Sequence, residues 1–305
     1  MKYEEFITQL ELTLSKMVQD DETVHIQKVP KNNGVTLIGI CIVRKGGKII
    51  PTIYLDEYYR RLRAGSSMEE IANEILDKHR QLVMTDDKDF GFFTEFEQVK
   101  SRIVFRLVNY DRNKERLAQM PYERYLDLAV VFYCHLSAER GGHAAIPIYT
   151  QHLKMWKVEK SEVFRWARRN TPKLFPCELT DMKTMIQTVM SEEEKQECER
   201  IMREEGSGVI PMYILTNVHR LNGASVILYR KVLDDFAKSC KGSFFLLPSS
   251  IHEVILVPAQ NAVSMEELSQ MVRDVNETQV EAEEFLSDHA YYYDAESRRL
   301  LCEIP

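Results

Sequence analysis

The feature that most constrains the fold is the run VTLIGICIV at residues 35–43, which is apolar on both faces and rich in β-branched residues. A short run of this kind, with turn-forming residues on either side, predicts a well-buried strand. The alternating segment 24–29 precedes it, and the segment IIPTIYL at 49–55 follows it. Together the three segments predict an antiparallel meander, in which Pro51 places the third strand at an edge or a bulge.

Beyond the meander, short strand-like and helix-like segments follow one another in an irregular order. Helical spacing of apolar residues predicts helices over 3–18 and 151–170, and Pro172 is expected to end the second one. The predicted strands lie at 102–109, 126–135, 144–149, 209–216 and within 244–258, with a last hairpin over 294–297. Because most of these strands are joined by hairpins rather than by long helices, the sequence predicts an α+β protein with mostly antiparallel sheets and packed helices.

The tetrapeptide Ser-Met-Glu-Glu occurs twice, at 67–70 and at 264–267, and apolar residues at helical spacing follow it each time. Serine followed three residues later by glutamate is typical of a capping box at the start of a helix. Two interpretations are open. Either the chain contains a weak internal repeat, or the chemistry of helix capping has produced the same four residues twice.

The length of 305 residues favours two domains, since single domains usually have about 100–200 residues. The segment SEEEKQECERIMREE begins at Ser191, is mostly charged and is followed by a glycine-serine stretch. Such a segment is typical of a solvated helix or a linker. We therefore predict an N-terminal α+β region at 1–190, a charged connection at 191–208 and a C-terminal α+β domain at 209–305.

The charge and cysteine content indicate where the chain resides. A net charge of −7 argues against nucleic acid binding, and the arginine clusters at 60–63 and 165–169 are expected to be solvated helix faces. The six cysteines are scattered without a Cys-x-x-Cys pair, which favours a reducing compartment. The acidic N-terminal segment is unlike a signal peptide, and no run approaches about 18 apolar residues. We expect a cytoplasmic protein without a membrane span.

The motifs for nucleotide cofactors are missing from the sequence. It contains neither the glycine-rich P-loop pattern nor the dinucleotide-binding pattern, and Gly46-Gly47 and Gly141-Gly142 are typical of turns. No cofactor is therefore predicted.

The densest group of residues that could hold a metal lies in the middle of the chain. His135, Glu139, His143 and His152 fall within 18 residues. Zinc needs three or four nitrogen, sulfur or oxygen donors that converge at about 2 Å. The spacing matches no common zinc module, so surface or core histidines are the alternative interpretation.

A second group of reactive residues lies between two apolar strands, in the segment Pro248–Glu253. Ser249, Ser250, His252 and Glu253 supply the residue types of nucleophilic catalysis. Residues so close in sequence seldom face one another, and the Gly-x-Ser-x-Gly elbow of many hydrolases is missing. An ordinary loop between hairpin strands is the alternative.

Longer strings of residues carry a resemblance to a known family. They are LTNVHRLNGASVILYRKVLDDFAKSCKGSFFLLPSSIHEVILVP at 215–258, LDLAVVFYCHL at 126–136 and IPIYTQHLKMWKV at 146–158. With them the chain resembles an uncharacterised bacterial family of gut clostridia, and it is distantly similar to YtpQ-type proteins. The resemblance implies a bacterial, cytoplasmic protein and transfers no activity. It favours Ser249, His252 and Asn222 over other polar residues, because these three lie within the strings.

Three functional hypotheses follow. The leading one is a non-enzymatic binding or interaction protein with a protein partner or a small molecule, because no complete catalytic constellation is visible. The alternative is a hydrolase that uses Ser249 or Ser250 with His252, or a metal at His135, His143 and His152. A small-molecule sensor is the third. The sequence leaves the oligomeric state open.

Overall fold

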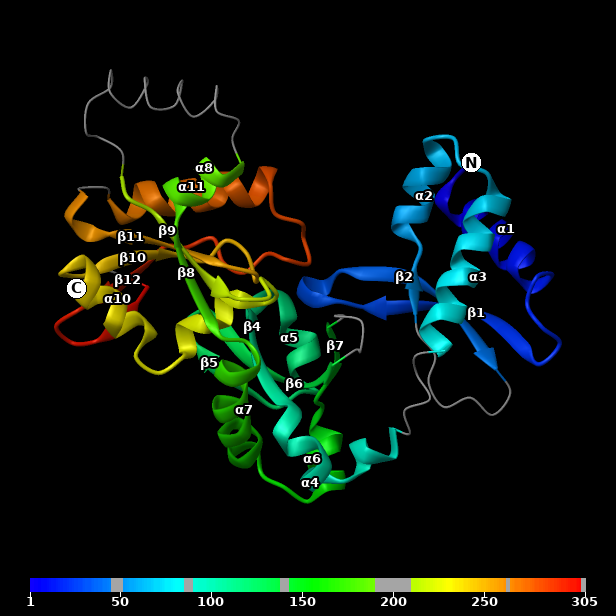
Figure 1. The fold of residues 1–305 in the computed structure, drawn as a ribbon, viewed down its shortest axis with the longest axis horizontal. Coiled ribbons are helices and arrows are strands. Elements are labelled where there is room, and N and C mark those ends of the chain that lie inside the picture. Colours follow the sequence, from blue (N-terminus) through cyan, green and yellow to red (C-terminus); the bar gives the residue numbers. More distant parts are fainter. Residues whose placement is uncertain (45–51, 85–89, 138–142, 190–209, 262–263, 303–305) are drawn as a thin grey trace. The chain divides into compact units, whose positions relative to one another are not determined.

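The computed structural model describes residues 1–44, 52–84, 90–137, 143–189, 210–261 and 264–302 (Figure 1). The chain forms two compact units, residues 1–95 and 96–305. Three antiparallel sheets lie within the described residues, and helices pack against them. This arrangement confirms the predicted α+β class.

The first unit packs helices on a three-stranded sheet in the order β1–β2–β3, which is the predicted meander. Its elements are α1 (Tyr3–Ser15), β1 (Glu22–Pro30), β2 (Thr36–Arg44), β3 (Ile53–Tyr54), α2 (Asp56–Arg63) and α3 (Met68–Met84). Phe6, Leu10 and Leu14 of α1 are fully buried in its core, as their helical spacing predicts. Pro51 lies outside the described residues.

The second unit contains two sheets. One has six strands in the order β13–β12–β10–β11–β9–β8, and the other contains β4, β5, β6 and β7, the last three of which are adjacent in sequence. The strands are β4 (Ile103–Asn109), β5 (Tyr122–Tyr125), β6 (Leu128–Ser137), β7 (His143–Pro147), β8 (Cys177–Asp181), β9 (Tyr213–Asn217), β10 (Phe244–Leu247), β11 (Val254–Pro258), β12 (Tyr291–Asp294) and β13 (Arg299–Leu301). The hairpins β10–β11 and β12–β13 confirm the two predicted near the C-terminus.

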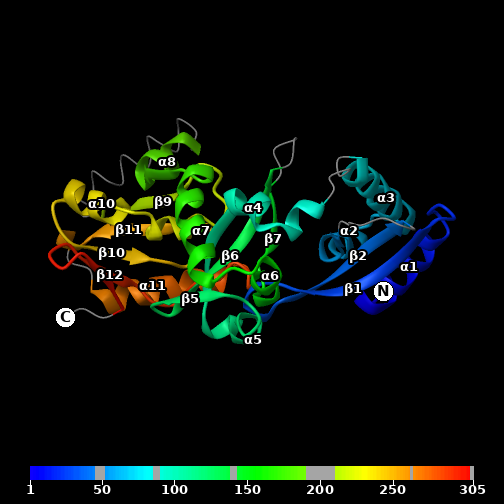
Figure 2. The same ribbon diagram turned by 90° about the horizontal axis from the view of Figure 1, so that it is seen from below.

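The helices of the second unit are α4 (Phe96–Val99), α5 (Lys114–Leu117), α6 (Thr150–Trp156), α7 (Lys160–Leu174), α8 (Met182–Val189), α10 (Val232–Cys240) and α11 (Met265–Thr278), with a 3₁₀ helix η5 (Gly223–Leu228). Helices α10 and α11 lie on opposite faces of the larger sheet, and α7 packs on β4 of the smaller sheet (Figure 2). Among the described residues, no helix has both the length and the apolar character needed to cross a membrane.

The helix predicted over 151–170 is two helices, and its predicted end is wrong. Lys157 adopts a left-handed conformation with φ 56° and ends α6. Helix α7 then continues through Pro172, which was expected to stop it. The Thr171 hydroxyl donates to the Ala167 carbonyl at 2.7 Å, and the Phe175 amide donates to the Thr171 carbonyl at 2.8 Å. These bonds hold the turn on either side of the proline while α7 packs on β4.

Buried polar side chains join the parts of the second unit. The Asn170 amide of α7 donates to the carbonyls of Lys100 at 2.7 Å and Ile103 at 3.0 Å. The Asn109 amide at the end of β4 donates to the Leu286 carbonyl at 2.9 Å. Tyr291 of β12 donates to Asp127 from the turn before β6. The two sheets of this unit are therefore tied by hydrogen bonds between residues distant in sequence.

The two compact units divide after Glu95, and the domain boundary expected at 191–208 stays a prediction. Residues 190–209 lie outside the described part, but the strands that flank them are hydrogen-bonded neighbours. The pairs run from Cys177 opposite Asn217 to Asp181 opposite Tyr213. The described strands on either side of the expected connection therefore belong to one sheet of the second unit.

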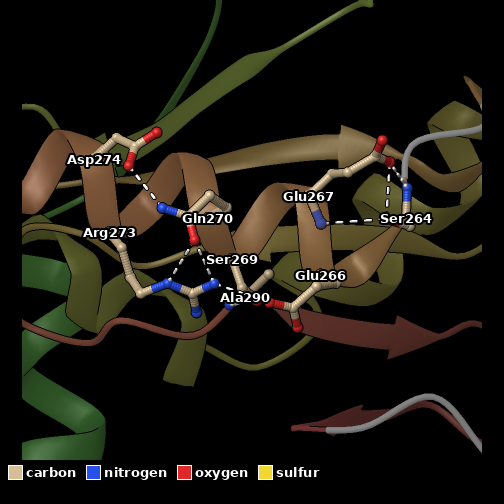
Figure 3. Close-up of polar contacts among 8 residues, drawn as sticks. All are labelled: Ser264, Glu266, Glu267, Ser269, Gln270, Arg273, Asp274 and Ala290. Atoms are coloured by element: carbon tan, nitrogen blue, oxygen red, sulfur yellow. Dashed lines mark hydrogen bonds and ion pairs between the residues drawn. The ribbon is translucent and has the colours of Figure 1, made fainter.

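Both Ser-Met-Glu-Glu segments form the predicted capping boxes. The Glu70 amide donates to the Ser67 hydroxyl at 3.2 Å, and the Glu267 amide donates to the Ser264 hydroxyl at the same distance (Figure 3). The sheets beside the two helices differ in strand order. Cap chemistry therefore accounts for the shared tetrapeptide, and an internal repeat stays a prediction.

Candidate functional site

A cleft of about 730 Å³ lies in the second unit, between α7 and the segment that joins η5 to α10. We call it the arginine cleft, because four arginines line it together with apolar and aromatic residues. No aspartate or glutamate is among the described residues at its wall. Its lining consists of Phe105, Arg165, Arg168, Arg169, Pro172, Pro176, Cys177, Leu228, Tyr229, Arg230 and Val232.

Helical spacing brings three of these arginines together. Arg165, Arg168 and Arg169 are three and four residues apart on α7, so they share one face of the helix. The other face carries buried residues, among them Val163 and Ala167, that hold α7 in place. The predicted exposure of this cluster is confirmed. The structure adds that the exposed face borders a cleft.

The fourth arginine is held in position by its neighbour. Tyr229 is 6% exposed, and its hydroxyl donates to the Phe175 carbonyl at 2.8 Å. Its ring meets the edge of Phe105 at 6.0 Å between centroids. Burial raises the pKa of Tyr229, so its phenol stays neutral near pH 7. The anchored tyrosine fixes the backbone from which Arg230 extends into the cleft.

The arginines of the cleft have few negative partners. Arg165 lies 3.9 Å from the Glu162 carboxylate, at the outer limit of an ion pair. Within the described part of the chain, no carboxylate lies within 4.0 Å of Arg168, Arg169 or Arg230. The cleft therefore holds positive charge that the described residues leave largely unneutralised, in a chain whose net charge is −7.

Aromatic rings and a thiol complete the surroundings. Arg168 lies over the Phe164 ring at 5.4 Å, and Arg169 lies over the Trp166 ring at 5.5 Å. These contacts orient the guanidinium groups without cancelling their charge. The pKa of the Cys177 thiol is raised, first by desolvation and then by Glu178. The thiol therefore stays uncharged at neutral pH and leaves the cleft cationic.

A second polar centre, the His252 network, lies where the loop after β9 meets the β10–β11 hairpin. It comprises Thr216, Asn222, Ser250, His252, Glu253 and Glu284. The loop makes an unusually close approach at Gly223. A Cβ atom there would lie 2.0 Å from the Thr216 hydroxyl oxygen and 2.4 Å from the His252 carbonyl oxygen. Only glycine therefore fits at this position.

The His252 imidazole has a partner at each ring nitrogen. Its Nδ1 accepts from the Asn222 backbone amide at 3.4 Å, and its Nε2 lies 3.3 Å from the Glu284 carboxylate. The accepting Nδ1 assigns the proton to Nε2, which donates to Glu284. Neither nitrogen is left to take a proton from a serine hydroxyl.

The predicted serine candidates face other groups. The Ser250 hydroxyl accepts from the His252 backbone amide at 3.0 Å and interacts with the Glu253 carboxylate. Burial, the largest effect, raises the pKa of Glu253. Ser249 contributes its backbone carbonyl to Leu286 at 2.9 Å. The structure thus brings Ser250, His252 and Glu253 together without placing a serine hydroxyl on the imidazole.

The predicted metal ligands are spread over several elements. His135 is buried on β6, where its ring meets the edge of Phe175 at 5.1 Å. His152 lies on α6, where its Nδ1 accepts from the Tyr149 amide at 3.1 Å. His143 begins β7, and Glu139 lies outside the described residues. No group of three metal-ligating side chains occurs in the described ranges, so a metal site here stays a prediction.

An α+β chain with an arginine-lined cleft is a broad class, and the family match is more specific. The chain belongs to a family of unknown function (DUF5688), whose model matches residues 3–295. No curated protein matches the chain, and no solved structure matches it.

Proposed function

We propose that this protein is a non-enzymatic binding protein whose second unit takes a small anionic molecule in the arginine cleft. The observation that carries the proposal is the set of three arginines, Arg168, Arg169 and Arg230, that line one cleft without a carboxylate partner in the described structure. Guanidinium groups bind carboxylates and phosphates through paired hydrogen bonds, which makes such a set well suited to an anion.

The size and lining of the cleft support a small molecule rather than a macromolecule. Pockets for small ligands usually measure about 300–1,000 Å³, and the volume of about 730 Å³ falls within this range. Phe105, Leu228 and Tyr229 add apolar and aromatic surface beside the charges. The preferred ligand therefore combines two or more negative charges with a less polar part.

Isothermal titration calorimetry with pyrophosphate and citrate tests the proposal. The wild-type protein is expected to bind at least one of these probes. The double variant R168A–R230A is expected to bind it at least tenfold more weakly, which corresponds to about 1.4 kcal/mol. A preference for pyrophosphate would indicate a phosphorylated ligand, and a preference for citrate would indicate a polycarboxylate.

A matched control removes the same charge elsewhere. The double variant R63A–R299A replaces two exposed arginines outside the cleft, and it is expected to bind like the wild type. Equal weakening in both double variants would show a general effect of net charge and would refute a site in the cleft. Absence of binding of either probe to the wild type would also contradict the proposal.

The cellular setting is part of the proposal as well. The resemblance to bacterial proteins and the scattered cysteines support a bacterial, cytoplasmic binding protein. Fractionation of cells that express the full chain tests the compartment. Recovery in the soluble fraction without the periplasm is expected, and recovery with membranes would contradict it.

A further inference from the structure

A pair of arginines lies on another part of the second unit. Arg106 and Phe105 are consecutive on β4, so their side chains point to opposite faces of the sheet. Phe105 faces Tyr229 and the arginine cleft. Arg106 therefore lies on the other face, where its Cζ is 4.2 Å from the centre of the Tyr133 ring.

The second arginine of the pair reaches the same tyrosine from another element. Arg116 on α5 donates from Nη2 to the Tyr133 hydroxyl at 3.2 Å. Tyr133 is 8% exposed, so it is a fixed point between the two guanidinium groups. One group stacks on its ring, and the other binds its hydroxyl.

The two arginines are half-buried beside an apolar cluster. Val104, Val131 and Leu117 belong to the same buried cluster as Tyr133. Burial lowers the pKa of Arg106, Arg116 lowers it further, and only Tyr133 opposes them. No carboxylate lies within 4.0 Å of either arginine in the parts of the chain that the structure describes.

An unpaired cation in such surroundings is costly. Removing part of a guanidinium from water without a negative partner is unfavourable, because lost hydration is not replaced by an opposite charge. An apolar side chain of similar volume would avoid this cost. The charge at Arg106 therefore points to a group outside the described chain that completes it.

We propose that Arg106 and Arg116 form a second anion site, distinct from the arginine cleft, that binds a single carboxylate group. Two guanidinium groups offer the planar donors that match a carboxylate. The apolar residues around them favour an anion with one charge over a phosphate with two. The carboxylate belongs to a ligand or partner whose neighbouring atoms are apolar.

The test follows the arginine Nε–Hε signals by NMR in the full chain, with sodium acetate and inorganic phosphate as probes at constant ionic strength. The signals of Arg106 and Arg116 are assigned from the variants R106M and R116M. Acetate is expected to shift both signals along a saturable curve with a midpoint on the order of millimolar. In R106M, the midpoint for the remaining Arg116 signal is expected to rise at least tenfold.

R124M provides a matched control. Arg124 also stacks on a tyrosine, with its Cζ 3.6 Å from the Tyr110 ring centre, but it is exposed and its Nε donates to the Leu126 carbonyl at 2.8 Å. Acetate is expected to bind R124M and R168A–R230A like the wild type. Unchanged acetate binding by R168A–R230A would show that this site is distinct from the arginine cleft. Each of the two proposals can therefore fail without the other.

Thermal unfolding distinguishes a binding role from a structural one. Without probe, R106M is expected to melt at or above the wild-type temperature, because methionine removes an unpaired charge and keeps the volume. A lower melting temperature together with no saturable acetate shift in the wild type would make the arginine structural and overturn the proposal. Saturation by phosphate alone would overturn the assignment to a carboxylate.

Discussion

The arginine cleft and the His252 network both lie in the second unit, and they differ in whether their polar side chains have partners within the protein. In the network, His252 has a partner at each ring nitrogen, and Glu284 is one of them. In the cleft, Arg168 and Arg230 have no carboxylate within 4.0 Å in the described structure. One centre is closed by its own residues, and the other leaves its charge available.

This difference separates residues that hold the fold from residues that can hold a ligand. A hydrogen-bonded group inside the protein has already exchanged water for an internal partner, so its removal weakens the folded state. An exposed cation without a partner adds little to stability, so its removal affects binding instead. The network should therefore respond to substitution in unfolding experiments, and the cleft should respond in binding experiments.

The largest expected effect is that of G223A, which tests the tight packing beside the His252 network. An added Cβ would overlap the Thr216 hydroxyl and the His252 carbonyl at 2.0 and 2.4 Å, so the loop must move. We expect a loss of about 3 kcal/mol or more in the free energy of unfolding, measured with guanidinium chloride.

G242A is the matched control for this prediction. A Cβ at Gly242 would meet only the end of the Gln260 side chain, at 3.3 Å, and that side chain can shift. Its free energy of unfolding is expected to stay within about 0.5 kcal/mol of the wild type. If G223A were equally stable, the loop would not be closed as described, and the comparison with the cleft would fail.

The next effect concerns pH and Glu253. Burial raises its pKa above the ordinary value of 4.5 in the folded state, so the folded state holds this proton more tightly than the unfolded state. Its contribution to stability is complete below pH 4.5 and is lost as the pH rises through the raised pKa. The side chain at this position in E253Q does not titrate. The free energy of unfolding of E253Q should therefore rise relative to that of the wild type between pH 4.5 and 7.

Urea unfolding of both proteins across this pH range measures the difference. Parallel stability curves for the wild type and E253Q would show that Glu253 does not titrate differently in the folded state. Glu253 does not line the arginine cleft, so anion binding by E253Q should match that of the wild type. A joint loss of binding would link the two centres and break the comparison.

The smallest expected effect compares arginines with and without partners. Arg273 on α11 lies 2.9 Å from the Glu266 carboxylate, and its Nε donates to the Gln270 side chain at 3.2 Å (Figure 3). R273A is expected to lose about 0.5 kcal/mol of unfolding free energy in low salt. R168A–R230A is expected to show no loss or a small gain. Opposite results in urea unfolding would reverse the distinction between the two kinds of arginine.

Much of the fold could be predicted where one local pattern decides the structure. The run at 35–43 became β2, and the capping boxes at Ser67 and Ser264 start helices as expected. Strand β8 was missed because Cys177–Asp181 is short, polar and without a buried residue. It is a strand only because β9 pairs with it, and that pairing joins segments on either side of residues 190–209.

The candidate sites could be predicted only in part, for a similar reason. The arginines of α7 were recognised as one exposed face. Arg230 lies beside them because the hydrogen bond from the Tyr229 hydroxyl to the Phe175 carbonyl fixes the neighbouring backbone. The cluster at Ser249–Glu253 was recognised as a group of reactive residues. The direction of the His252 ring depends on Glu284 and Asn222, which come from segments that no local spacing relates to it.

The hydrogen bonds between Asn109 and Leu286 and between Asp127 and Tyr291 also bear on folding during synthesis. The described core of the first unit uses residues between Phe6 and Leu76, so it can assemble while the ribosome is still translating the second unit. The second unit cannot complete its larger sheet until Tyr291 has left the exit tunnel, because the inner strand β10 lacks its neighbour β12 before that point. Its apolar sheet surfaces therefore stay open for most of translation, and we expect the nascent chain to be most prone to aggregation through this unit.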